Sequence, residues 1–219
     1  MRKPIIEFIG TFFLVLTIAL SVGWSSTIAA LAIGSMLMAM VYMGGHISGA
    51  HYNPAVTVAI AIRGKCPPRD VGAYIVAQLL GAIAAAAVAH FLNGKAFVPM
   101  PAHADIVDSM YWARILVAEA VFTFALASVV LHVATHKGTS GNSFYGLAIG
   151  FTVAASAVAI GPVSGAALNP AVGIGPALYA LVTGAHPPAS NFLIYTVGPI
   201  AGAIVAALAF NAVKGPDAE

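Results

Sequence analysis

Two nearly identical stretches decide the fold: Ser48–Val56 reads SGAHYNPAV, and Ser164–Val172 reads SGAALNPAV. They share seven of nine residues and lie 116 positions apart. Asn is a preferred helix N-cap, and Pro is favoured at the first helical position, so each Asn-Pro-Ala motif predicts the start of a helix. The residues of the two motifs are Asn53, Pro54, Ala55, Asn169, Pro170 and Ala171.

The composition around these motifs is that of a membrane protein. Apolar residues make up 60% of the 219 residues, and charged residues make up only 7%, against about 25% in a typical soluble protein. So few charges cannot cover the surface of a globule. Several apolar runs approach the ~20 residues that span a bilayer. The chain is therefore predicted to cross the membrane several times.

Hydropathy and helix breakers predict an all-α protein with six spans and two shorter apolar helices. The six spans are expected at about 5–25, 27–45, 71–92, 112–134, 143–161 and 190–213. The short helices, about 53–62 and 169–181, begin at the two motifs. At ~1.5 Å per residue each reaches only part of a hydrocarbon core ~30 Å thick, so both are expected to be re-entrant.

The two halves of the chain repeat each other, within a single domain covering 1–219. The pattern E-x-x-x-T-F occurs in the first span and again in the fourth, 112 positions later. Each half, about 1–95 and 110–213, has three full spans, an odd number, so the second half is expected to lie upside down relative to the first. Inverted repeats with broken helices place a solute path at the midplane. The repeated residues are Glu7, Thr11, Phe12, Glu119, Thr123 and Phe124.

The distribution of Lys and Arg predicts the orientation. With both termini inside, seven cations fall on the inner side and two, Lys95 and Arg114, on the outer side, as the positive-inside rule requires. The short termini and loops are typical of a bacterial inner membrane. The inner cations are Arg2, Lys3, Arg63, Lys65, Arg69, Lys137 and Lys214.

If the short helices enter from opposite faces, their N-termini meet near the bilayer centre. Each end carries roughly +0.5 elementary charge and unpaired N–H donors. The carbonyl of each capping Asn is tied to its own helix, which leaves its NH₂ group facing the lumen. Such a junction is expected to bind the oxygen of a neutral molecule and to repel cations.

The stretches HISGAHYNPAVT and GPVSGAALNPAVGIGPAL resemble the aquaporin and glycerol-facilitator (major intrinsic protein) family. The resemblance covers nearly the whole chain, and it implies a passive pore in each subunit of a homotetramer. It implies that Glu7 and Glu119 hold the loops by accepting hydrogen bonds from main-chain amides, with a proton relay as the alternative. It also implies that His51 lines the cytoplasmic half of the pore. No metal or other cofactor is expected.

The family resemblance also locates a selectivity filter, and here the sequence departs from the family. The residue directly after the second motif is typically Arg in family members, but in this chain it is Val172. Strict water channels usually have His at the position of Ala157 and a large aromatic residue at that of Ile33. The expected filter is therefore wide and apolar, guided only by backbone carbonyls around Gly165, Ala167 and Leu168. Its four positions are Ile33, Ala157, Ala166 and Val172.

These features predict a passive channel for water and neutral solutes such as arsenous acid, methylated arsenicals, urea or small polyols. The alternatives are a plain water channel, a proton-coupled transporter and a structural junction protein. A net charge of +2 without a basic cluster argues against nucleic-acid binding. The single Cys66 excludes a disulfide framework and a multi-thiolate zinc site. An enzyme is not expected, because no nucleophile, base and orienting group occur together.

Overall fold

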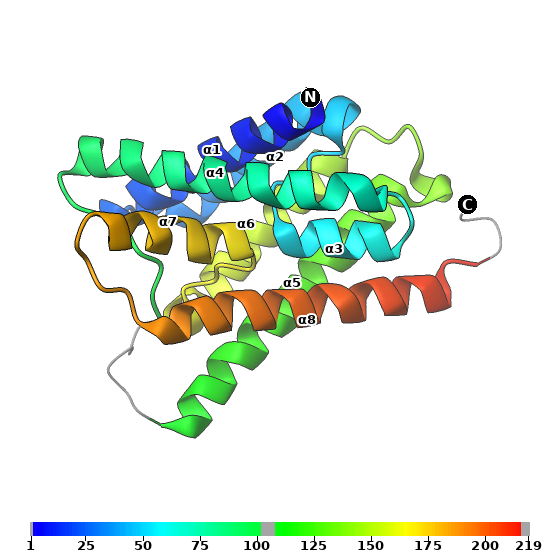
Figure 1. Ribbon diagram of the computed structural model, residues 1–219. Helices are drawn as coiled ribbons and strands as arrows, with labels where there is room; N and C mark the ends of the chain where they lie inside the picture. The colour runs from blue at the N-terminus through cyan, green and yellow to red at the C-terminus, as the bar shows by residue number, and fades with distance from the viewer. Residues whose placement is uncertain (1, 102–107, 216–219) are drawn as a thin grey trace.

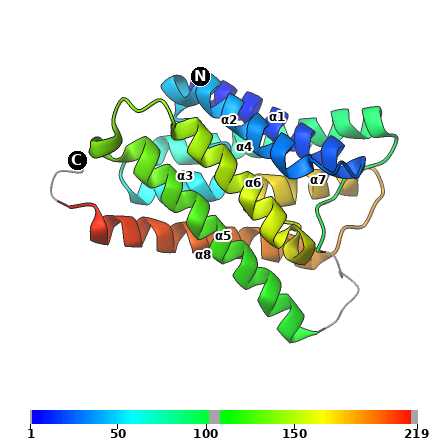
Figure 2. The same cartoon turned by 180° about the vertical axis from the view of Figure 1, so that it is seen from behind.

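A computed structural model describes residues 2–101 and 108–215, and in these residues every regular element is helical. The long helices run side by side, with α5 strongly tilted against α8 (Figures 1 and 2). The six long helices are α1 (Arg2–Gly23), α2 (Ala29–Ser48), α4 (Pro68–Asn93), α5 (Ser109–Thr135), α6 (Tyr145–Ser164) and α8 (Ala189–Val213). The shorter elements are α3 (Pro54–Ile62), α7 (Pro170–Val182) and the 3-10 turn η1 (Lys137–Thr139).

The prediction of six spans and two short helices is confirmed, since all six long helices are long and apolar enough to cross a membrane. Two predicted spans ended three residues too early, at 45 and 161. Both helices continue to the serine of their motif and are closed by Gly49 and Gly165, whose φ values of 90° and 84° are left-handed and favour glycine. Pro162 lies inside the last turn of α6 without ending it.

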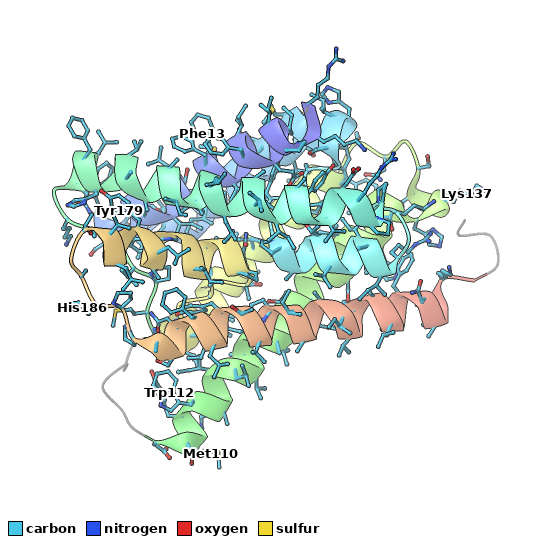
Figure 3. The ribbon with its side chains drawn as sticks, in the orientation of Figure 1. Phe13, Met110, Trp112, Lys137, Tyr179 and His186 are labelled. Carbon is cyan, nitrogen blue, oxygen red and sulfur yellow. The ribbon has the colours of Figure 1, made fainter. Side chains whose placement is uncertain are left out.

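Large apolar side chains point outward from the bundle, as expected of a surface that faces lipid. Phe91 is 87% exposed and Val158 is 69% exposed. Polar residues gather instead at the two ends of the bundle, where Lys137 marks one end and His186 the other (Figure 3). The arrangement is that of a multi-pass membrane protein.

Helices of the bundle approach closely where glycine replaces a larger residue. A Cβ atom at Gly34 of α2 would lie 2.7 Å from the Cβ atom of Ala154 on α6, and one at Gly150 of α6 would lie 2.8 Å from that of Met38 on α2. On α8, a Cβ atom at Gly198 would lie 2.8 Å from the Cβ atom of Glu119 on α5. Such contacts are typical of small-residue helix crossings in membranes. They bring α2 against α6 and α5 against α8.

Candidate pore and its two capped loops

The two short helices lie end to end, with their N-termini meeting inside the bundle (Figure 1). Each begins as the motif predicts. The side-chain oxygen of Asn53 accepts a hydrogen bond from the main-chain N–H of Ala55 at 2.8 Å, and that of Asn169 accepts one from Ala171 at 2.9 Å. Both Asn residues have extended backbone, and Pro54 and Pro170 open the helices.

Each Asn also reaches across to the other loop. The Asn53 Nδ2 atom donates to the main-chain oxygen of Leu168 at 2.8 Å, and the Asn169 Nδ2 atom donates to that of Tyr52 at 2.9 Å. The expectation that the whole NH₂ group faces the lumen is therefore wrong. One of its two N–H groups braces the opposite loop, which leaves one N–H on each Asn for a solute.

The carboxylate of Glu7 accepts four hydrogen bonds inside the bundle. Its Oε1 atom accepts from the Ser48 hydroxyl at 2.6 Å and from the main-chain N–H of His51 at 3.0 Å. Its Oε2 atom accepts from the main-chain N–H of Tyr52 at 2.6 Å and from the Gln78 amide at 2.8 Å. Glu7 is fully buried, so these contacts join α1 to the first loop.

Glu119 repeats this arrangement in the second half. Its carboxylate accepts from the Ser164 hydroxyl at 2.7 Å and from the main-chain N–H groups of Ala167 at 3.0 Å and Leu168 at 2.7 Å. Glu119 is also fully buried. The contacts of both acids are those that a loop-holding role requires, and neither acid lines a cavity with the candidate pore residues.

The loops need such support because their backbones are strained. Left-handed φ values near 50° occur at two non-glycine residues in each loop, at equivalent positions of the two motifs. Backbone of this kind costs on the order of 1–3 kcal/mol per residue unless the surroundings hold it. The residues with φ between 50° and 51° in the loops are Ala50, Tyr52, Ala166 and Leu168.

Two tyrosines complete the support of the loops, and the sequence analysis missed them. The Tyr74 hydroxyl donates to the main-chain oxygen of Ser48, and the Tyr195 hydroxyl donates to that of Ser164, both at 2.6 Å. Tyr74 and Tyr195 lie 121 positions apart, close to the spacing of the repeat. Because this spacing exceeds the 116 positions between the motifs by five, only a search that allows insertions within the repeat would have paired them.

His51 belongs to a hydrogen-bond network that has no counterpart in the second half. The Thr57 hydroxyl donates to the main-chain oxygen of Asn53 at 2.9 Å and accepts from the Gln78 amide at 3.0 Å. Since a hydroxyl has one proton, the His51 Nδ1 atom, 3.1 Å from the Thr57 oxygen, must be the donor. The His51 Nε2 atom is then an acceptor in the neutral ring.

A cavity of about 490 Å³ brings most of the predicted pore residues together. It runs from the connection between α1 and α2 past the four filter positions to the two capping Asn residues. The Pro and Ala residues of the motifs do not line it, because they are buried in the short helices behind the Asn side chains. The predicted residues in its wall are Ile33, His51, Asn53, Ala157, Gly165, Ala166, Ala167, Leu168, Asn169 and Val172.

A second cavity, of about 510 Å³, lies at the opposite end of the bundle, under the connection between α5 and α6. Its wall includes Lys65, His136 and Lys137, together with the C-terminal end of α2. The two cavities together extend from one end of the bundle to the other.

The comparisons with known proteins agree with this architecture. Residues 1–210 match the family model "Major intrinsic protein". Aquaporin NIP1-1 of Zea mays is 38% identical over 221 residues, covering 97% of this chain and 75% of that protein. Aquaporin NIP1-3 of Oryza sativa subsp. japonica is 39% identical over 228 residues, covering 99% and 75%. The X-ray structure of the aquaglyceroporin from Plasmodium falciparum has a similar fold, with a TM-score of 0.84, 22% identity and coverage of 98% and 97%.

Proposed function

The chain belongs to the major intrinsic protein family, whose members are passive membrane channels, and we propose that it conducts water and small uncharged solutes. The observation that carries this proposal is the cavity that leads to the paired Asn53 and Asn169 amides. Two helix N-termini and two free N–H groups there offer hydrogen bonds to a solute oxygen and oppose the entry of cations.

We further propose that the four outer positions favour solutes with an apolar face. Ile33, Ala157, Ala166 and Val172 carry aliphatic side chains, which cannot donate hydrogen bonds. Solutes passing them depend on main-chain carbonyls of the Gly165–Leu168 loop. Undissociated arsenous acid, methylated arsenicals, urea and small polyols are small and uncharged, so they are the solutes that we expect to pass this aliphatic lining.

The test is stopped-flow light scattering on proteoliposomes, with water compared with glycerol and urea, and with arsenite uptake measured at neutral pH. Fast entry of arsenite or polyols with modest water flux supports the wide apolar filter. Fast water flux without solute entry favours the plain water channel. Accumulation of a solute against its gradient points to the coupled transporter, and the lack of any flux points to a structural protein.

The orientation and assembly are also proposals. The excess of cations at one end of the bundle supports cytoplasmic termini under the positive-inside rule. We propose a homotetramer with one pore in each subunit, in a plasma membrane. The relatives compared by sequence, from Zea mays and Oryza sativa, are plant proteins, so they do not support the expected bacterial inner membrane. Protease protection of tagged termini and mass measurement in detergent test orientation and assembly.

A further inference from the structure

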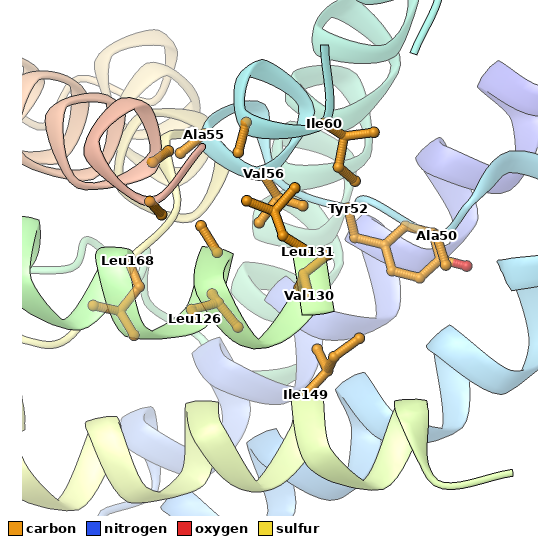
Figure 4. Packing of buried hydrophobic residues seen from close by; sticks show 14 of the residues in the cluster. Ala50, Tyr52, Ala55, Val56, Ile60, Leu126, Val130, Leu131, Ile149 and Leu168 are labelled. Atoms are coloured by element: carbon orange, nitrogen blue, oxygen red, sulfur yellow. The ribbon is translucent and has the colours of Figure 1, made fainter. Parts of the chain in front are cut away.

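The two cavities share only three lining residues among those that the structure describes. These are Ala50 in the first loop, Val130 on α5 and Ile149 on α6. All three are nearly buried, with exposed fractions of 7%, 6% and 5%. Figure 4 shows Ile149 pointing from its helix toward Val130. We call these three residues the inner neck.

On both α5 and α6, the residue of the inner neck lies between a residue that lines the outer cavity and one that lines the inner cavity. On α5, Leu126 lines the outer cavity and Val133 the inner one, with Val130 between them. On α6, Val153 lines the outer cavity and Tyr145 the inner one, with Ile149 between them. The change from one cavity to the other therefore occurs within about two helical turns on both helices.

The four filter positions and both capping Asn residues line only the outer cavity. The outer cavity thus includes both the predicted filter and the Asn pair, and its boundary with the inner cavity lies on the far side of that pair. This position differs from the one at which the sequence predicted the selective constriction.

We propose that the inner neck, rather than the outer four positions, sets the largest solute that this channel passes. The inference rests on the proposed channel function and deepens it. Three aliphatic side chains give a solute no hydrogen bonds in exchange for its lost water, and an apolar constriction of this kind resists wetting. Compact neutral solutes pass such a neck more easily than extended polyols, which must shed more water.

The test compares two double variants in proteoliposomes. Val130→Ala with Ile149→Ala widens the inner neck, and Val121→Ala with Leu147→Ala removes the same number of carbon atoms from exposed positions of the same two helices, outside both cavities. We expect the neck variant to raise the ratio of glycerol to water permeability about tenfold, and erythritol entry to become measurable. The control variant is expected to keep the wild-type ratio.

Thermal unfolding in detergent identifies the variant proteins that fold, and Ile149→Phe offers a second, space-filling test that lowers the same ratio. If the neck and control variants both conduct water and have equal ratios of glycerol to water permeability, the inner neck does not set the largest solute. The proposed channel function would be unaffected by that result. If neither the wild type nor the neck variant passes water faster than empty vesicles, the proposed function fails and the inference fails with it.

Discussion

The side-chain amide of Asn53 donates a hydrogen bond of 2.8 Å to the main-chain oxygen of Leu168, which lies in the other half of the chain. In the same way, the side-chain amide of Asn169 donates a hydrogen bond to the main-chain oxygen of Tyr52 in the first half. Each Asn thus caps its own short helix and braces the opposite loop. The two halves therefore position each other at the centre of the candidate pore.

Replacing Asn53 with Ser separates these two tasks. Ser remains a good N-cap, so the start of α3 is preserved, but its short hydroxyl does not reach Leu168. The buried carbonyl of Leu168 loses its donor, and we expect a loss of about 1–3 kcal/mol in stability. Thermal unfolding in detergent measures this loss. An Asn53→Ser protein as stable as the wild type would show that the brace contributes nothing.

Much of the fold follows from local sequence, because the features that decide it are local. The length of the apolar segments determines the six spans, and the Asn-Pro pairs determine where α3 and α7 begin. The repeated E-x-x-x-T-F pattern placed Glu7 and Glu119 on equivalent helices, and both contact the loops that the resemblance assigned to them.

Contacts between distant segments could not be derived in this way. Gln78 lies on α4, far from the motifs in sequence, and nothing local indicates that its amide joins Glu7 to Thr57. The inner neck is formed by Ala50, Val130 and Ile149, three aliphatic residues from three segments of an aliphatic-rich chain. Their role depends on how the helices pack, which hydropathy does not specify.

Glu7→Gln tests whether the buried acids are scaffolds. An amide replaces one accepting oxygen with an NH₂ group, which would then face the main-chain N–H of His51 or Tyr52. We expect the free energy of unfolding to fall by about 1–3 kcal/mol. Solute flux per folded channel should still follow the solute gradient alone, with or without a pH difference across the vesicle.

Asp70→Asn is the control for Glu7→Gln, because it also neutralises an acid. Asp70 forms surface ion pairs with Lys3, at 3.4 Å, and with Arg69, at 3.9 Å, and each such pair contributes ~0–1 kcal/mol. Wild-type transport that is driven by a proton gradient, and lost in Glu7→Gln, would contradict the scaffold role and support the coupled transporter.

Val172→Arg restores the residue that family members typically carry. The long side chain would enter the outer cavity beside Ala157 and Ala166, and its charge would oppose cations, at ~4 kcal/mol for a unit charge 4 Å away at an effective dielectric of 20. We expect glycerol and arsenite entry to fall far more than water flux. Val172→Met, which adds bulk without charge, separates the two effects. An equal loss of water and solute flux would rule out a filter at this position.

Cys66 is expected to react slowly with thiol reagents. It lies between α3 and α4, is only 4% exposed, and its burial raises the pKa of the thiol above the ordinary value. Because the thiolate is the reactive form, less of it exists at pH 7 than in an unfolded chain, and labelling should keep accelerating as the pH rises beyond about 8.5. Maleimide labelling followed by mass spectrometry measures this, with protein unfolded in SDS as the fast reference.

Thr57→Val and Thr123→Val form a matched pair that tests the His51 network. Both threonines are fully buried, and Val has nearly the shape of Thr. The Thr57 hydroxyl contacts His51, Gln78 and the main-chain oxygen of Asn53. In the described part of the chain, the Thr123 hydroxyl has no hydrogen-bond partner.

Removing the Thr57 hydroxyl leaves the His51 Nδ1–H and one Gln78 N–H without their acceptor. We therefore expect Thr57→Val to lower the free energy of unfolding by about 1–3 kcal/mol, and Thr123→Val to be neutral or slightly stabilising. His51 should also lose its fixed tautomer, which NMR of ¹⁵N-labelled histidine detects as a change in the Nδ1 and Nε2 shifts. Equal losses of stability in the two variants, with the His51 shifts unchanged, would mean that Thr57 only fills space.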